Sequence, residues 1–306
     1  MKVFRYEALF SPAAGNASRW AVKHMKTKTL SYFIAIAALI MSVVSACNSV
    51  SPTVKSTTPI PTLQNDQKME QVEDLLVNNK NCKLPCWWGI IPGQTEWQAS
   101  EKFLGTIARD MNSFESQGNV FHIAIFSVPE NIAFSKELWH RYNEQNGIVE
   151  SIEIDPGRSI VYSLPNVLMN YGQPDEVWIS WINTKPNSKG YFPVFVNLYY
   201  RSQGILVEYM PNRLTIKNKN TVIACPQNYE FPKIFVWSTK AKNDYSFERI
   251  FEQTEFLNGK ELSYLSLEEA TGMTLERFYS TFKNVDNTTC IETRIDLWPK
   301  GKNPFE

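Results

Sequence analysis

The sequence has few of the residue patterns on which enzymes and metal sites are built. It contains three histidines, and only His122 and His140 follow His24. Neither stands at a metal-ligand spacing such as His-x-His or His-Glu-x-x-His. The nucleophile elbow Gly-x-Ser-x-Gly, the P-loop and the Gly-x-Gly-x-x-Gly fingerprint are also absent. We therefore expect a protein that is not an enzyme and binds no metal or cofactor. We interpret both histidines as solvent-facing or hydrogen-bonded strand residues.

One long apolar run is present, Leu30–Val44, and it has the form of a secretory signal. Lys26 and Lys28 precede it, and the small residues of Val44–Ala46 lead to Cys47. About 15 apolar residues make a short membrane span but a typical signal core. A cysteine after Val-Ser-Ala resembles the lipobox of bacterial lipoproteins, in which it is acylated, with palmitate for example, and becomes the first mature residue. We expect a lipoprotein anchored through Cys47; an uncleaved membrane anchor is the alternative.

The residues around this signal divide into three segments. The charged segment that precedes the apolar core of a lipoprotein signal is usually short, and Met25-Lys26-Thr27-Lys28 would be such a segment. We therefore interpret residues 1–24 as upstream sequence from a misassigned start, with a long first segment of the signal as the alternative. Residues 25–46 are then the signal peptide, and residues 47–65, rich in Ser, Thr and Pro, a disordered tether. This arrangement predicts the cell membrane or the outer membrane, on the extracytoplasmic side.

Runs of Lys and Arg are missing from the mature chain. Residues 1–46 hold six of the 31 Lys and Arg residues and one of the 31 Asp and Glu residues. The remaining 260 residues therefore carry 25 basic and 30 acidic side chains, a formal net charge of −5. A mildly acidic protein does not attract a phosphate backbone. We expect no nucleic-acid partner.

Four cysteines follow Cys47, an even number in a compartment where disulfides persist. Three pairings are possible. We favour Cys82–Cys86, which closes a tight loop that contains Pro85, together with Cys225–Cys290, which joins the start of the C-terminal region to its end. A zinc site would need two closely spaced pairs, and a redox centre would need a thioredoxin-like pattern. The cysteines are therefore predicted to form structural bridges.

The hydrophobic period changes along the chain in a way that predicts helices and strands. Helical spacing begins near Asp66, and it returns after a capping box formed by Thr95 and Gln98. After Gly118 the period falls to two. Residues 120–128 are predicted as a strand, and residues 138–144 and 148–154 as a hairpin. Its turn, Asn146-Gly147, is the favoured pair for type I′.

A similar plan follows in the next segment. Ser163 to Gly172 has the pattern of a short helix, and residues 177–182, 191–200 and 205–210 have that of strands. We expect an α+β fold in which residues 66–224 form two tandem helix-plus-three-strand units. They would share one antiparallel sheet with helices on one face. Residues 225–306 would be a small, disulfide-closed α/β region.

Two fragments resemble a known family of domains. Gly93–Gly105 (GQTEWQASEKFLG) resembles the opening of BamE/SmpA-type lipoprotein domains, and Val167–Trp178 (VLMNYGQPDEVW) is similar to the exit of the same motif. The β-lactamase inhibitor protein fold places two such units in tandem. The first fragment lacks the Pro after Leu-Gly, and the second lacks the Gly-x-Thr. Cys82–Gly93 also resembles a group of bacterial lipoproteins. The resemblance implies a class and a compartment, not a chemistry.

Aromatic and acidic residues are the remaining functional signals. Tryptophan is frequent at binding surfaces. The members of a pair such as Trp87/Trp88 or Trp178/Trp181 point to opposite faces of an extended chain, so one of each pair is a candidate for a binding surface. We favour the other interpretation, in which these tryptophans fill the core between the sheet and the helices. The strand acids Glu150, Glu153, Asp155 and Glu208 are either a solvated face or an acid–base pair.

These observations favour a non-enzymatic module that binds a protein partner or a cell-envelope polymer through the open face of its sheet. The alternative is a carbohydrate-binding or carbohydrate-active module that uses the tryptophans and the strand carboxylates. Tryptophans in a groove with paired carboxylates would favour the alternative.

The lipid anchor gives the first testable prediction. Cys47→Ala is expected to abolish lipid labelling and to leave the precursor uncleaved, because acylation of this thiol precedes cleavage. Labelling of cells with a palmitate analogue, followed by immunoblotting, measures both effects. Unchanged processing of the variant would mean that an ordinary signal peptidase, or none, acts on the chain.

Overall fold

The computed structural model describes residues 64–116, 118–182, 194–210, 215–218, 220–225, 231–240, 245–247, 249–250 and 262–298. The predictions for residues 1–63, including Cys47 and nearly all of the tether, lie outside this part of the chain. The described residues belong to one compact unit, Ile60–Glu306. Within them, no helix is both long enough and apolar enough to cross a membrane.

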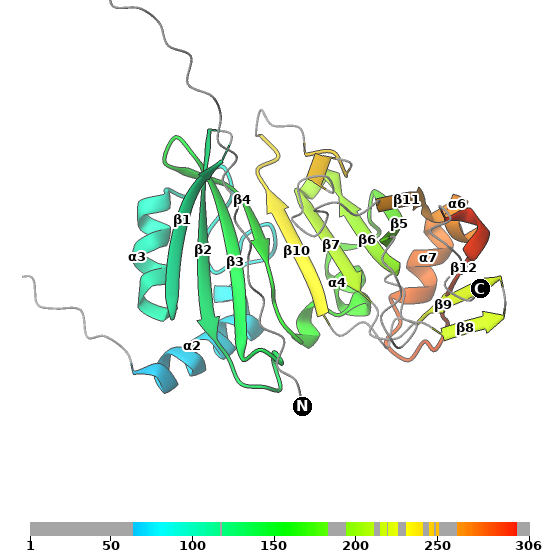
Figure 1. Ribbon diagram of the computed structural model, residues 1–306, viewed down its shortest axis with the longest axis horizontal. Coiled ribbons are helices and arrows are strands. Elements are labelled where there is room, and N and C mark those ends of the chain that lie inside the picture. Colours follow the sequence, from blue (N-terminus) through cyan, green and yellow to red (C-terminus); the bar gives the residue numbers. More distant parts are fainter. Residues whose placement is uncertain are drawn as a thin grey trace, which may run out of the picture. The chain divides into compact units, whose positions relative to one another are not determined.

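A nine-stranded antiparallel sheet forms the centre of this unit, in the order β1-β2-β3-β4-β10-β7-β6-β5-β11 (Figure 1). Its strands are β1 Asp110–Ser116, β2 Asn119–Ser127, β3 Glu137–Gln145, β4 Ile148–Ile154, β5 Glu176–Ile182, β6 Val194–Tyr200, β7 Ile205–Met210, β10 Phe231–Trp237 and β11 Leu262–Ser266. A smaller sheet, β12-β9-β8, contains β8 Thr215–Asn218, β9 Thr221–Ala224 and β12 Ile291–Arg294. The predicted α+β class, with a large antiparallel sheet, is confirmed.

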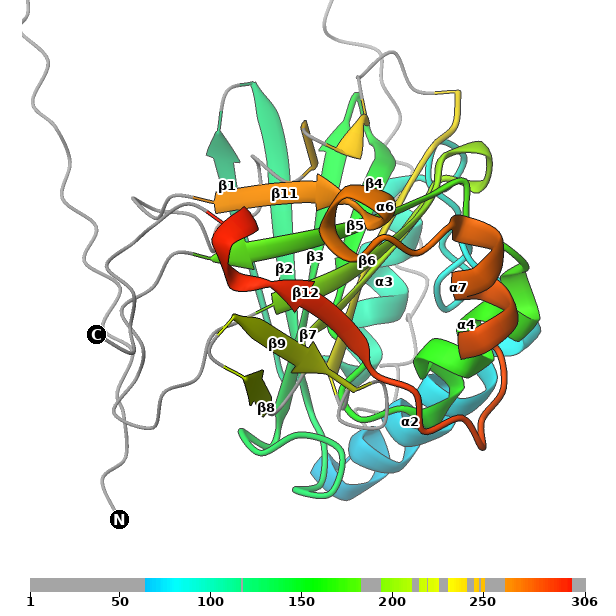
Figure 2. The ribbon, with the colours of Figure 1, turned by 90° about the vertical axis from the view of Figure 1, so that its right-hand side faces the viewer.

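Helices α2, α3, α4 and α7 lie on one side of the large sheet (Figure 2). The helices are α2 Asn65–Asn78, α3 Trp97–Ile107, α4 Leu164–Tyr171, α6 Leu267–Thr271 and α7 Leu275–Phe282, and the short 3₁₀ helices are η1 Asn79–Asn81, η2 Ile160–Tyr162, η3 Arg201–Gln203 and η6 Ile295–Leu297. Each of the four helices has an apolar stripe in the core, for example Val72 and Leu76 of α2 or Phe278 and Phe282 of α7.

Local sequence signals locate the β3–β4 hairpin correctly but miss the edge strand β1. Strands β3 and β4 turn at Asn146 and Gly147, whose φ angles of 52° and 81° suit a type I′ turn. Strand β1 was not predicted, because its residues are mostly polar. It lies at one edge of the sheet, and most of its side chains are exposed.

The start of α3 also differs from the prediction. Thr95 does not cap the helix: its Oγ1 accepts a hydrogen bond from the Ile91 backbone N–H (2.8 Å). The Trp97 N–H donates to the Gly147 carbonyl (2.8 Å), and Glu96 forms a β-bridge with Ile148. The helix therefore begins at Trp97, directly after the residues that pair with the β3–β4 hairpin, and no side chain caps its first turn.

The segment after Cys225 contributes to the large sheet rather than forming a separate region. Strand β10 lies between β4 and β7, with Ile234 opposite Ile154 on one side and Val207 on the other. Strand β11 pairs with β5 at the far edge. Both disulfides have the predicted pairing, Cys82–Cys86 and Cys225–Cys290.

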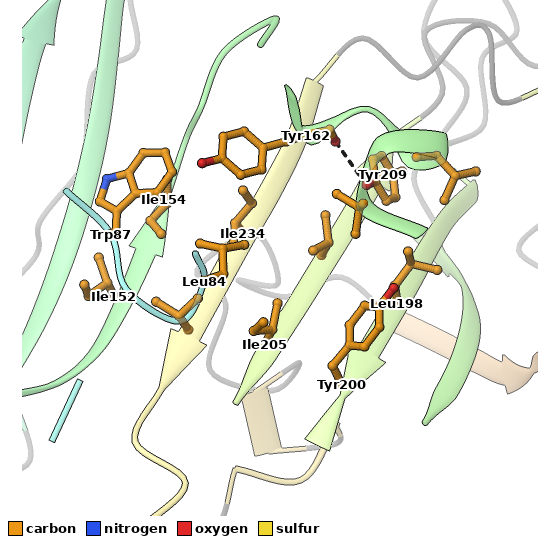
Figure 3. Packing of buried hydrophobic residues seen from close by; sticks show 14 of the residues in the cluster. Leu84, Trp87, Ile152, Ile154, Tyr162, Leu198, Tyr200, Ile205, Tyr209 and Ile234 are labelled. Carbon is orange, nitrogen blue, oxygen red and sulfur yellow. Dashed lines mark hydrogen bonds between the residues drawn. The ribbon is translucent and has the colours of Figure 1, made fainter. Parts of the chain in front are cut away.

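One apolar core runs without interruption along the helix-covered face (Figure 3). Buried side chains of β4, β10 and β7 follow one another across it, including Ile154, Ile234 and Ile205. Tyr209 of β7 donates from its hydroxyl group to the Tyr162 carbonyl (3.0 Å). The core therefore joins the strands on both sides of β10.

The two disulfides are expected to differ in their contribution to stability. In the chain-entropy model the Cys225–Cys290 bridge, with a sequence separation of 65, is worth about 4 kcal/mol, and the Cys82–Cys86 bridge, with a separation of 4, about 2 kcal/mol. Replacing both cysteines of a bridge by serine should therefore lower the free energy of unfolding more for Cys225/Cys290. Urea denaturation of the two double variants measures this, and an equal loss would contradict the entropic account.

Candidate functional site

Two of the four tryptophans considered for a binding surface, Trp87 and Trp88, lie in the core. Both are 0% exposed, and their rings stack with centroids 5.2 Å apart. Trp88 has a φ of 53°, so the backbone is not extended there and both rings point inward. Trp87 Nε1 donates to His140 Nδ1 (3.3 Å), and Trp88 Nε1 donates to the Leu75 carbonyl (3.1 Å). The candidate surface role of this pair is therefore corrected.

The second tryptophan pair gives no open surface either. Trp181 is 6% exposed and stacks on Trp298, with centroids 5.8 Å apart. Trp178, on the opposite face of β5, is half-buried beneath Phe247 (5.0 Å) and beside Tyr264 (5.7 Å). It belongs to a small second core on the face away from the helices. Both tryptophan pairs therefore contribute to packing, which is the interpretation that the sequence favoured.

A row of four charged side chains crosses the face of the sheet opposite the helices. It consists of Arg141 on β3, Glu153 on β4, Lys233 on β10 and Glu208 on β7, and we call it the ionic row. Arg141 lies opposite Glu153, and Lys233 lies opposite Glu208. Residues alternate between the faces of a strand, so these side chains point away from the core.

Glu153 is the most deeply placed member of the ionic row. Its side chain is shared between two cations, with Arg141 Nη2 2.6 Å from Oε2 and Lys233 Nζ 3.9 Å from Oε1. The residue is 7% exposed. A carboxylate at this depth needs such partners, because an unpaired buried charge is very costly. The arrangement keeps a charged group close to the surface of the sheet.

Aromatic rings border the ionic row. Lys233 Nζ lies 5.1 Å from the centre of the half-buried Trp139 ring, and Arg141 Cζ lies 5.7 Å from the Phe121 ring. Phe121 stacks in turn on Phe114, with centroids 5.3 Å apart. Phe114 is 39% exposed. A cation above an aromatic face is attracted to it, and a ligand could pack against the same ring or bond to the same cation.

Glu208 occupies a position that disfavours its charge. Burial raises the pKa of the Glu208 carboxyl to about 7; Lys233 opposes this shift, and Glu153 adds to it. Glu208 lies opposite the buried Asn197, whose Nδ2 donates to the Trp178 carbonyl (3.2 Å) and to Ser180 Oγ (3.0 Å). Among the described residues, Asn197 Oδ1 has no hydrogen-bond donor.

The structure separates the four strand acids identified from the sequence. Glu153 and Glu208 enter the ionic row. Glu150 lies at the irregularity between β3 and β4, where the register shifts, and it stays outside the row. Asp155 follows β4; burial raises its pKa, and its Oδ1 accepts a hydrogen bond from the Gly157 N–H (2.9 Å). The sequence did not indicate Arg141, Lys233 or Trp139, because their proximity depends on pairing between distant strands.

The two histidines lie on the helix-covered face, and both are hydrogen-bonded. His140 is buried beside the Trp87 and Trp88 rings, and burial lowers its pKa to about 3. His122 contacts Ser113 through Nδ1 (2.6 Å) and Glu144 through Nε2 (2.8 Å). Within the described ranges, no three His, Cys, Asp or Glu side chains come together as a metal site.

Comparisons of this chain with protein-family models, with curated proteins and with solved structures find no match.

The raised pKa of Glu208 predicts that the stability of the folded protein depends on pH. The folded-state pKa of about 7 lies above the ordinary 4.5, so the folded protein holds a proton that the unfolded chain releases. The free energy of unfolding should therefore fall as the pH rises from about 4.5 through about 7. Glu208→Gln should remove this fall. The free energy of unfolding of the variant, compared with that of the unmodified protein, should be higher at pH 8 than at pH 4.5 by on the order of 2 kcal/mol. Urea denaturation at both pH values measures it.

Glu70→Gln on the exposed side of α2 is the matched control. If its pH profile changes as much as that of Glu208→Gln, burial at position 208 is not the cause.

Proposed function

We propose that this protein is a lipoprotein, anchored to the extracytoplasmic side of a cell-envelope membrane through Cys47. Its folded unit binds a protein partner or a cell-envelope polymer through the ionic row. The observation that carries the binding role is the ionic row itself, in which Glu153 and Glu208 sit among two cations and aromatic rings. Complementary charges of this kind give an interface its specificity.

The position of Glu208 supports a ligand in particular. A neutral side chain there would avoid the cost that burial imposes on the carboxylate. Buried ionisable side chains that destabilise the fold in this way are frequent at functional sites, where a bound ligand offsets the cost of burying their charge. A ligand with an amino or hydroxyl group would donate to the Glu208 carboxylate and offset that cost.

A carbohydrate is the second candidate ligand, and Trp139 is the observation that favours it. The half-buried Trp139 ring lies beside Lys233, whose ammonium group is also near Glu153. Sugars pack on tryptophan faces while their hydroxyl groups bond to neighbouring carboxylates. The tryptophan relevant to this alternative is therefore Trp139 rather than the two pairs singled out in the sequence.

We also propose that the sheet contains two tandem units, as the resemblance to BamE/SmpA-type domains implies. Helix α3 precedes the strands β1 to β4, and helix α4 precedes β5 to β7. In each case the strands pair with their sequence neighbours. The units would then meet through β10.

Site-specific crosslinking in cells tests the binding role. A photoreactive phenylalanine analogue at position 139 of the full-length protein should give a discrete adduct, because Trp139 borders the ionic row. Glu208→Gln should reduce the adduct several-fold while leaving the folded state at least as stable. Sensitivity of the adduct to protease or to glycan-degrading enzymes separates a protein from a carbohydrate.

The same analogue at Met169, an exposed residue of α4, is the control on the helix-covered side. Equal adducts from both positions, or none from position 139, would contradict a binding site at the ionic row.

A further inference from the structure

Three side chains on adjacent strands form a hydrogen-bonded chain near the β1 edge of the sheet. Ser113 Oγ on β1 lies 2.6 Å from His122 Nδ1 on β2, and His122 Nε2 lies 2.8 Å from Glu144 Oε2 on β3. Ser113 is exposed, His122 is buried and Glu144 is half-buried. The chain therefore runs from a solvent-accessible hydroxyl group, through an imidazole, to a carboxylate.

The two contacts fit a neutral imidazole between a hydroxyl group and a carboxylate. With Glu144 ionised and His122 neutral, the imidazole proton lies on Nε2 and is donated to the Glu144 carboxylate. Nδ1 then has a free electron pair, and the Ser113 hydroxyl donates to it. This is the arrangement of a nucleophile and its general base. The ring nitrogens are used in the reverse order from serine proteases, but the neutral imidazole accepts a proton at whichever nitrogen lacks one.

Two further contacts hold this chain in place. Glu144 Oε1 accepts a hydrogen bond from the Gly147 N–H (3.1 Å), which orients the carboxylate. The Trp97 ring stacks on the His122 ring with centroids 3.7 Å apart and planes 8° apart. Both the base and its partner are therefore fixed before any substrate arrives, as catalysis by preorganised groups requires.

The stacking contact also links the first residue of α3 to the imidazole. Trp97 is the first residue of α3, and no side chain caps that turn. The next residues, Gln98 and Ala99, are exposed. The N–H groups of a first helical turn carry partial positive charge and stabilise developing negative charge.

We propose that Ser113, His122 and Glu144 form a catalytic site that hydrolyses carboxylic esters. Ser113 Oγ attacks the ester carbonyl carbon while His122 takes the hydroxyl proton, and a tetrahedral intermediate with a negatively charged oxygen forms. The carbon–oxygen bond to the alcohol then breaks, and His122 returns the proton to the departing alkoxide. Water, deprotonated by the same imidazole, attacks the acyl-serine and releases the carboxylic acid and the free serine.

This activity is independent of the ionic row. His122 faces the helices, whereas Arg141 and Glu153 point to the other side of the sheet. The absence of a nucleophile elbow in the sequence does not bear on it, because the three residues come from three strands. Loss of binding at the ionic row and loss of ester hydrolysis are therefore separate outcomes.

A fluorophosphonate probe tests the proposal on the full-length protein in detergent, since it modifies only activated serines. The probe should label the protein, and mass spectrometry should locate the adduct on Ser113. Ser113→Ala should lower both the labelling and the hydrolysis of p-nitrophenyl butyrate by at least about a hundredfold. It removes one exposed oxygen atom, so folding should be retained, as circular dichroism can verify.

Ser116→Ala, at another exposed serine of β1, is the control and should keep full labelling. Glu144→Gln should lower hydrolysis at least about tenfold because the amide no longer stabilises the imidazolium ion. Absence of label on Ser113 of the unmodified protein, or unchanged ester hydrolysis in Ser113→Ala, would overturn the proposal. The hydrogen bonds among Ser113, His122 and Glu144 would then only stabilise the pairing of the three strands.

Discussion

The pairing of β10 with both β4 and β7 is the constraint on which the rest of the structure depends. Without β10, each of these strands would have an unpaired edge, and the sheet would fall into two parts. On one face of β10, Ile234 and Val236 fill the core; on the other, Lys233 and Phe235 lie among the residues of the second face. One late segment of the chain thus completes the sheet, the core and the ionic row together.

The ionic row shows how register converts distant residues into a site. Arg141 and Glu153 come from one hairpin, but Lys233 reaches Glu153 only because β10 aligns Phe235 with Glu153 and Lys233 with Glu208. A slip of one residue would turn Lys233 into the core and Ile234 out of it. Because burying Lys233 and exposing Ile234 are both unfavourable, the apolar core fixes the geometry of the charged face.

The sequence predicted the features that depend on neighbouring residues. The Asn146-Gly147 turn, helix α4 after Ser163 and the Cys82–Cys86 bridge follow from local chemistry. Once that bridge is assigned, Cys225 and Cys290 are the remaining pair. Features set by tertiary contacts were beyond it. Trp88 turns inward because its backbone takes a positive φ, where Asn79 Oδ1 accepts its N–H (2.6 Å). The position of β10, and with it the ionic row, depends on pairings between segments far apart in the chain.

The first residues of α3 illustrate the same limit at the Ser113 site. Read alone, Thr95 and Gln98 form a good capping box. In the folded chain Val149 donates to the Thr95 carbonyl (3.0 Å), and the Trp97 N–H reaches the Gly147 carbonyl. The β3–β4 hairpin therefore determines where α3 begins, and it also carries Glu144 and the Gly147 N–H that orients it. Because one turn positions Glu144 and, through Trp97, the His122 ring, the geometry of the chain from Ser113 to Glu144 depends on the best-predicted element of the sequence.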